Sequence, residues 1–263
     1  MSAVAAPVRP AGPGTATVLG RAAVAEWVRL RTVRTTWWCL LAAAVTIVGI
    51  GLMAAYDEAA GPGEVGGPLP ATFAGEFGVL LGQFALLVLA LLAATSEHAT
   101  GAIGPTLQWT PRRGVLLAAR VGVPVAVATV AGVLLALVAD VAASWIAPDL
   151  TLTAGGLAGS LGRIAAVLAA GGALAVGTGL LLRSTAGALA TVFLLQLVLP
   201  FLLPAFGVAW MADLGELLPG SGAIWTLLAQ PDMSATQATA LLAGWSAAAL
   251  AAGGWSLLRR DAG

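Results

Sequence analysis

The sequence predicts an all-α fold of the polytopic membrane class, and three observations lead to this prediction. Of the 263 residues, 59% are hydrophobic and only 9% are charged, and the mean hydropathy is +0.96. A soluble domain carries about 25% charged residues because its surface faces water. The second observation is a series of long apolar runs, and the third is an alternation of basic and acidic segments between them. Most of the surface is therefore expected to face lipid.

Six apolar runs are each long enough to cross a bilayer core about 30 Å thick, which takes roughly 20 helical residues. They cover residues 37–56, 77–95, 115–139, 157–182, 186–206 and 235–258. The strands of a membrane barrel are only about ten residues long and alternate strictly between polar and apolar positions. These runs are longer and apolar on every face, so residues 37–258 are predicted to form six transmembrane helices.

The distribution of charge predicts the orientation of these helices. The segments before the first run, between the second and third, between the fourth and fifth, and after the sixth contain all the arginines but one: Arg9, Arg21, Arg29, Arg31, Arg34, Arg112, Arg113, Arg120, Arg183, Arg259 and Arg260. The other connections are predicted to be acidic loops without an arginine, and they carry Asp57, Glu58, Glu64, Glu76, Asp140, Asp149, Asp213, Glu216 and Asp232. By the positive-inside rule the basic segments are cytoplasmic. Both termini, including the tail 259–263, are expected inside the cell.

The N-terminal region divides into two parts. Residues 1–18 are rich in Pro, Ala and Gly and are predicted to be a disordered cytoplasmic lead. Residues 19–36 place apolar side chains opposite basic ones at helical spacing, which predicts an amphipathic helix in the membrane interface. Its characteristic residues are Glu26, Trp27, Arg29, Arg31 and Arg34. Either these arginines only enforce topology, or the helix also docks a partner.

Several kinds of chemistry are excluded by residue counts. Cys39 is the only cysteine and His98 the only histidine, so an intrachain disulfide, a cysteine metal site and a haem with paired histidines are not expected. The chain has no lysine and no GxxxxGK[ST] motif, so it cannot supply a Walker lysine to ATP. No cofactor and no nucleic-acid partner are expected.

The segment 96–120 is the longest predicted cytoplasmic connection between spans. Topology alone requires only a short polar turn there. Instead it contains Ile103, Leu107 and Trp109 between charged ends, which favours a surface that touches protein or lipid.

Three motifs resemble those of the membrane subunit, or permease, of ABC type-2 transporters, especially the bacterial exporter branch. They are AEWVRLRTVRTTWW at 25–38, SEHATGAI with TLQWTPRRGVLLAAR at 96–120, and LLRSTAGAL at 181–189. With the six runs, the resemblance covers the chain from about residue 19 onward. The chain departs from the family pattern at Gly104 and Pro105, where basic or polar residues are usual. Because proline removes a backbone donor, the short helix expected there is broken or begins at Pro105.

The resemblance implies a multi-pass subunit of the bacterial plasma membrane that hydrolyses nothing itself. It implies separate cytoplasmic ABC ATPase subunits that bind ATP and Mg, and a second permease subunit, identical or related. The loop 96–120 then transmits ATPase closure to the helices. The expected contact residues are Glu97, His98, Thr106, Leu107, Pro111, Arg112 and Arg113. The alternatives are a solvated helix end for Glu97 and His98, and lipid anchoring for Arg112 and Arg113.

Polar residues within the runs are few. The resemblance places Gln83 and Gln196 along a translocation path, and interhelical hydrogen bonding explains them equally well. Arg163, the exception among the arginines, is expected to snorkel outward or to pair with Asp140, Asp149 or Glu216. A structural pair is preferred over a contact with cargo. Pro200 and Pro204 predict a kink or re-entrant turn in the fifth run.

Small residues predict where helices approach each other closely. Gly78 and Gly82 form a GxxxG pair, and Gly171, Ala175 and Gly179 form a stripe; packing within the chain is the preferred interpretation for both.

Other function classes stay open to different degrees. An ion-coupled secondary transporter needs ionisable residues at membrane depth, and the runs contain few. An intramembrane enzyme needs a nucleophile and a base there. A non-transporting membrane scaffold requires neither. If the chain is an exporter subunit, a path lined by Leu, Ala, Val and Gly favours amphipathic or hydrophobic cargo such as a drug, peptide or lipid.

Overall fold

The computed structural model describes residues 14–61, 70–100, 113–147, 150–228 and 233–260, and within them all regular structure is helical. The elements in chain order are α1 (Thr15–Thr32), α2 (Arg34–Ala60), α3 (Phe73–Thr100), α5 (Arg113–Ile146), α6 (Ala154–Leu182), α7 (Thr185–Phe193), a π-helical segment η1 (Leu194–Val198), α8 (Leu199–Ala205), α9 (Ala209–Glu216), α10 (Pro219–Leu228) and α11 (Ala235–Arg260). The all-α prediction is confirmed.

Five helical segments are long and apolar enough to cross a membrane, so the chain has the character of a multi-pass membrane protein. They are Arg34–Ala60, Phe73–Thr95, Gly114–Ile146, Ala154–Leu182 and Thr185–Ala205. Each corresponds to one of the first five predicted runs. The sixth run does form the helix α11, but its described part is less apolar because it contains residues such as Gln237, Thr239 and Ser246. The helix is therefore confirmed, while its role as a span is not.

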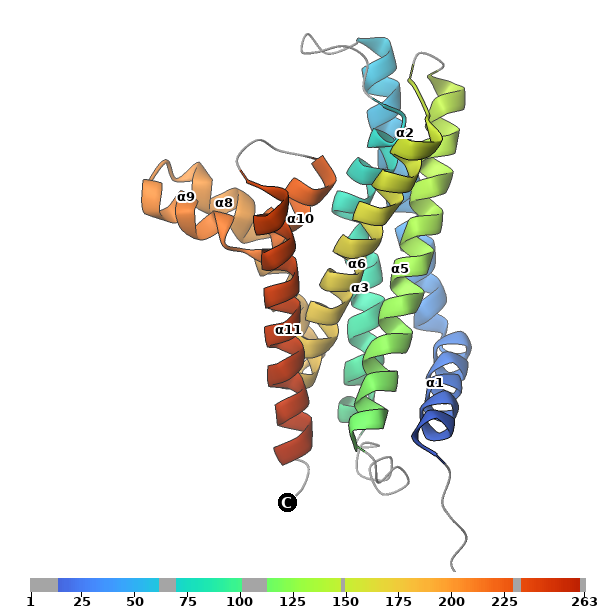
Figure 1. Ribbon diagram of the computed structural model, residues 1–263, viewed down its shortest axis with the longest axis vertical. Coiled ribbons are helices and arrows are strands. Elements are labelled where there is room, and N and C mark those ends of the chain that lie inside the picture. Colours follow the sequence, from blue (N-terminus) through green and yellow to red (C-terminus); the bar gives the residue numbers. More distant parts are fainter. Residues whose placement is uncertain (1–13, 62–69, 101–112, 148–149, 229–232, 261–263) are drawn as a thin grey trace, which may run out of the picture.

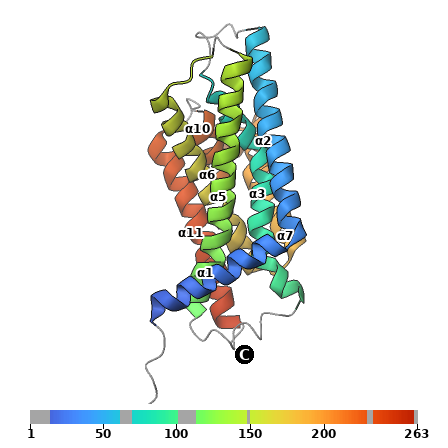
Figure 2. The same ribbon diagram turned by 90° about the vertical axis from the view of Figure 1, so that its right-hand side faces the viewer.

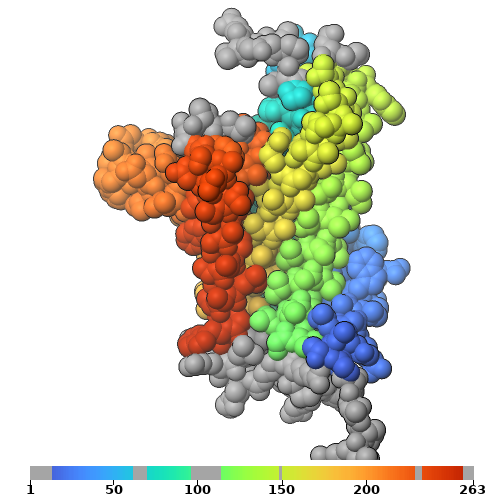
Figure 3. Space-filling model, in the orientation of Figure 1, coloured from blue at the N-terminus to red at the C-terminus, as the bar shows by residue number. Residues whose placement is uncertain are grey.

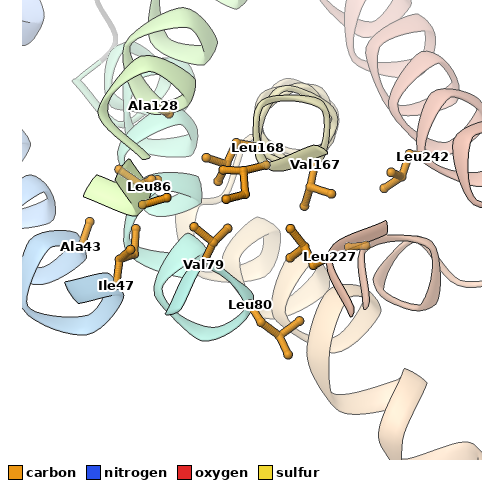
Figure 4. Close-up of a cluster of buried hydrophobic side chains, with 13 residues drawn as sticks. Ala43, Ile47, Val79, Leu80, Leu86, Ala128, Val167, Leu168, Leu227 and Leu242 are labelled. Atoms are coloured by element: carbon orange, nitrogen blue, oxygen red, sulfur yellow. The ribbon is translucent and has the colours of Figure 1, made fainter. Parts of the chain in front are cut away.

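The helices form an elongated bundle whose centre is α3 and α6 (Figure 1). Most residues in the apolar part of each of these two helices are buried, whereas most residues of α2 and α5 are partly or fully exposed, as in helices that face lipid. Figure 4 shows the main apolar core, where Ile47 of α2, Leu86 of α3 and Leu168 of α6 come together. All three are fully buried.

The predicted glycine contacts are packing contacts within the chain. A Cβ at Gly78 or Gly82 of α3 would overlap Ile47 of α2. A Cβ at Gly179 of α6 would lie 3.1 Å from the methyl carbon of Thr95. These glycines let helices approach at backbone distance, as small residues do in membrane bundles.

The chain bends in the fifth apolar run, as its prolines predict. α7 leads into η1, and Pro200 follows in the first turn of α8. Because proline lacks the backbone donor, the helical ladder is interrupted there. Figure 1 shows α8 and α9 pointing sideways from the bundle, and Figure 3 shows them as a separate projection. Gly207, with φ +69°, forms the turn between them, so this run does not continue as one straight helix.

The two ends of the bundle differ in charge. α1, the C-terminal end of α11, and the ends of α3 and α5 that border residues 101–112 lie at one end (Figures 1 and 2). The opposite end carries the last turn of α2 and the first turn of α3. Arginines such as Arg34 and Arg183 belong to the first end, and acids such as Asp57 and Glu58 to the second. We call these the basic end and the acidic end.

The interfacial segment begins earlier than predicted. Its helix α1 runs from Thr15 to Thr32, so residues 15–18, assigned from the sequence to the disordered lead, form its first turn. Val33 is extended, and α2 starts at Arg34 rather than at residue 37. Residues 1–13 of the predicted lead lie outside the described part of the chain.

Candidate functional site

A cluster of charged residues joins α1 to the bundle at the basic end. We call Glu26, Arg29 and Arg120 the basic-end cluster. Glu26 is buried on the face of α1 that meets α5, and Arg120 of α5 is almost completely buried. The Glu26 Oε2 lies 2.6 Å from the Arg29 Nη2, and its Oε1 lies 3.6 Å from the Arg120 Nε. One carboxylate therefore neutralises charge on two helices.

The same cluster also reaches α3. The Arg29 Nη2 donates a hydrogen bond of 2.6 Å to the carbonyl oxygen of Ala93, near the end of α3. Charge-assisted bonds of this kind are stronger than neutral ones. Leu30, one turn after Glu26, packs with Leu89 of α3. The helix α1 is thus attached to both helices that border residues 101–112.

The other helix ends at the basic end are attached to one another as well. The hydroxyl groups of Thr185 and Thr95 form a 2.9 Å hydrogen bond that joins α7 to α3. Arg183 ends α6 in a left-handed conformation and donates to the carbonyl oxygen of Ser256 on α11, at 3.3 Å. Ser184 caps α7 by accepting from the Gly187 N–H. The sequence LLRSTAGAL is therefore a tight helix-to-helix turn.

Sequence reasoning missed the role of Arg120. It was assigned to the basic connection before the third span, although it lies five residues inside the apolar run 115–139. An arginine inside an apolar run requires a partner at the same depth. The position of Arg120 within the run therefore indicated a buried partner. Glu26 was a candidate because it is the only acid in the predicted interfacial helix 19–36.

A second charged cluster lies at the acidic end. We call Glu76, Arg163 and Asp140 the acidic-end cluster. Arg163 of α6 forms an ion pair with Glu76 in the first turn of α3. Asp140 of α5 is fully buried, and its Oδ1 accepts a 2.7 Å hydrogen bond from the backbone N–H of Gly75.

Two expectations are corrected here. Arg163 was expected to pair with Asp140, Asp149 or Glu216, but it pairs with Glu76; Asp149 lies outside the described residues. Glu76 and Asp140 are not loop residues, because both lie within long apolar helices and are buried. The spans therefore contain more buried acid than the sequence suggested. From the sequence these two acids were assigned to loops because they lie just outside the apolar runs, whereas the helices extend beyond those runs.

The two glutamines assigned to a path are buried within the bundle. The Gln83 Nε2 donates to the carbonyl oxygen of Leu80 at 3.0 Å. Gln196 lies in η1, between Gly171 of α6 and Gly220 of α10. The Gln83 bond lies within α3, so it does not support hydrogen bonding between helices. A role in a translocation path stays a prediction.

A cavity of about 320 Å³ lies where the chain bends. Pro200 and Phe201 of α8, Glu216 of α9 and Trp225 of α10 line it. Its walls are mainly apolar, with one carboxylate at the rim. The two prolines of the fifth run predicted the bend but not the hollow.

The residues expected to contact an ATPase fall mostly beyond the structural description. Thr106, Leu107, Pro111 and Arg112 lie outside the described residues. Glu97 and His98 belong to the last turns of α3, and Arg113 begins α5, but their side chains lie outside the description. Within the described part of the chain, no three His, Cys, Asp or Glu residues come together as a metal site would require.

No known protein family matches this chain, and no curated protein matches it.

Proposed function

We propose that the chain is the membrane subunit of a bacterial ABC exporter, with ATP hydrolysed by separate cytoplasmic subunits. α11 is the sixth span in this proposal, and both termini are cytoplasmic. Two such subunits, identical or related, form the path for an amphipathic or hydrophobic cargo. The proposal combines the five apolar helices, the amphipathic α1 and the three motifs that resemble this family.

The observation that carries the proposal is the attachment of α1 to α3 and α5 through the basic-end cluster. α3 and α5 border residues 101–112, and Glu26, Arg29 and Arg120 join both helices to the interfacial helix. A displacement of that loop therefore moves two membrane helices and α1 together. A coupling element requires this kind of connection, because energy is transmitted through packed elements and bonded networks.

The geometry of α11 supports its place as the sixth span. Its 26 residues are about 39 Å long at 1.5 Å per residue, more than a bilayer core of about 30 Å. It packs along α6, where a Cβ at Gly177 would lie 2.5 Å from the backbone of Ala249. An even number of spans agrees with the position of α1 and the end of α11 at the same end of the bundle (Figure 1).

Loss of the basic charges of the loop tests the proposal. Arg112→Glu combined with Arg113→Glu is expected to abolish Mg-ATP hydrolysis that co-purifies with the tagged chain from native membranes. The matched control is Arg259→Glu with Arg260→Glu, which makes the same charge change at the C-terminal end of α11; hydrolysis should persist in that variant. Absence of ATP hydrolysis with the unmodified chain, or its persistence in the loop variant, contradicts the proposal.

An ion-coupled secondary transporter is the second candidate, because Glu76 and Asp140 are buried within apolar helices. Acids at membrane depth are typical of ion-coupled transport. Transport by the purified chain in vesicles, driven by a pH or sodium gradient with no ATPase present, is the outcome that selects it. If the chain is a non-transporting scaffold, no transport is expected with ATP or with an ion gradient.

A further inference from the structure

A groove of about 550 Å³ lies between α1 and the exposed face of α5. Trp27 of α1 lines it together with seven residues of α5 between Gly122 and Leu134. Nearly all of the exposed lining is apolar. Figure 2 shows α1 crossing the lower part of α5, which gives the groove a floor at the basic end.

The groove exists because small residues face outward near Trp27. Gly122, Ala126, Val130 and Leu134 follow each other at four-residue spacing, so they lie along one stripe of α5, and all are exposed. The first two leave a hollow beside the indole. A Cβ added at Gly122 would meet nothing within 4 Å.

The length of the groove matches one leaflet of a bilayer. From Gly122 to Leu134 the helix rises about 18 Å at 1.5 Å per residue. Half of a hydrocarbon core about 30 Å thick is about 15 Å. A single acyl chain, extended along α5 with its head group at α1, therefore fits the groove.

An arginine lies beside Trp27, at the end of the groove where a head group would lie. The guanidinium carbon of Arg31 lies 5.9 Å from the centroid of the Trp27 ring, a cation–π distance. Arg31 is exposed, whereas the acid of α1, Glu26, is buried on the face toward α5 and Arg120. An anionic group at this end of the groove would therefore be attracted by the exposed Arg31, and the buried Glu26 would not repel it directly.

We propose that this groove binds one acyl chain of an anionic phospholipid, whose phosphate is held by Arg31 above Trp27. The site requires only that the chain lies in a membrane, so it does not depend on the pairing with an ATPase. Bound lipid would cover the exposed side of the junction between α1 and α5 and so stabilise the position of the interfacial helix.

Filling the groove is the first test. The full chain is reconstituted in vesicles of phosphatidylglycerol and phosphatidylcholine in equal amounts, extracted in mild detergent, and analysed by native mass spectrometry. The unmodified chain is expected to retain phosphatidylglycerol preferentially, and Gly122→Leu is expected to lose that adduct. Gly49→Leu is the matched control, because Gly49 is exposed on α2 and a Cβ there also meets nothing within 4 Å.

Removing the charge is the second test, and it leaves the packing of the groove intact. Arg31→Gln is expected to lower retention of phosphatidylglycerol about five-fold, the effect of one basic residue at an anionic surface. Arg21→Gln makes the same change on another exposed face of α1 and should have little effect. Equal retention of both lipids by the unmodified chain, or retention unchanged in Gly122→Leu, overturns the proposal. A change of oligomeric state in Gly122→Leu without a change in lipid also overturns it, since a second copy would then cover the groove.

Discussion

Each of the two charged clusters contains a residue whose charge is opposite to that of its end of the molecule. The two clusters differ in how deeply their side chains are buried. Glu26 is an acid in the basic end, and Arg163 is a base in the acidic end. The side chains of Arg120 and Glu26 are 1% and 8% exposed. In the Arg163–Glu76 pair the arginine is 45% exposed and the glutamate 9%. The Glu26–Arg120 pair is therefore closed to solvent on both sides, and the Arg163–Glu76 pair is open on the side of the arginine.

This difference predicts different consequences of losing one partner. A guanidinium keeps its proton in proteins, so buried Arg120 cannot become neutral when its carboxylate is removed. An exposed arginine is already partly solvated and is screened by salt, so its pair contributes less. The basic-end cluster is thus expected to be a structural clamp, and the acidic-end pair a weaker constraint.

The largest effect is expected from Glu26→Gln. It removes the carboxylate that neutralises Arg120 and Arg29, and breaking a buried ion pair typically costs about 3–5 kcal/mol. The measurement is the thermal unfolding midpoint of the purified chain in detergent, followed by size-exclusion chromatography.

Two further variants make this prediction specific. Glu26→Leu with Arg120→Leu should recover most of the lost stability, because replacing a buried pair by apolar residues is often neutral. Arg21→Gln, an exposed position on the same helix, should leave the midpoint within error. If Glu26→Gln were as stable as Arg21→Gln, the clamp would be refuted.

A smaller effect is expected from Gly75→Ala at the acidic end. The new Cβ would lie 2.6 Å from the Asp140 Oδ1 and 3.0 Å from the carbonyl oxygen of Ala136. Overpacking of this kind costs about 2 kcal/mol. Thermal unfolding against Gly49→Ala, where the added carbon has open space, measures it. Equal stability of the two variants would mean that α3 and α5 can separate there without cost.

The smallest effect is expected from Arg163→Gln. The pair is exposed on one side, and the glutamine can still donate a hydrogen bond to Glu76, so a loss of about 1 kcal/mol is expected. The loss should shrink when unfolding is measured at high salt, because salt screens an exposed charge. The loss caused by Glu26→Gln should not depend on salt. A salt-independent loss larger than that of Glu26→Gln would reverse the comparison.

The helices could be predicted from the sequence. In a membrane, an apolar run of this length must form its backbone hydrogen bonds within itself, and a helix does so. The first five runs match observed apolar helices within four residues, except that the third helix ends at Ile146, seven residues beyond its predicted end. The helix 235–258 also formed, although its described part is too polar to count among them. The bend at Pro200 was predictable because proline removes a backbone donor.

The pairing of charges could be predicted only in part. The chain indicated that Arg163 needs a partner, but which acid meets it depends on the depth and rotation of α3 against α6. The importance of Arg120 was overlooked because it was grouped with Arg112 and Arg113 in one basic connection, while its ion-pair partner in space is Glu26 of α1.

The amino-acid sequence by itself determined a helical membrane chain with two ends of opposite charge, because hydrophobicity and charge act on each segment independently of the others. The tertiary structure alone decided that Glu26 and Arg29 attach α1 to α5 and α3, that the proline-containing α8 projects sideways with α9, and that a groove opens beside Trp27. These features depend on which faces of separate helices meet, and that is set by packing between residues far apart in the chain.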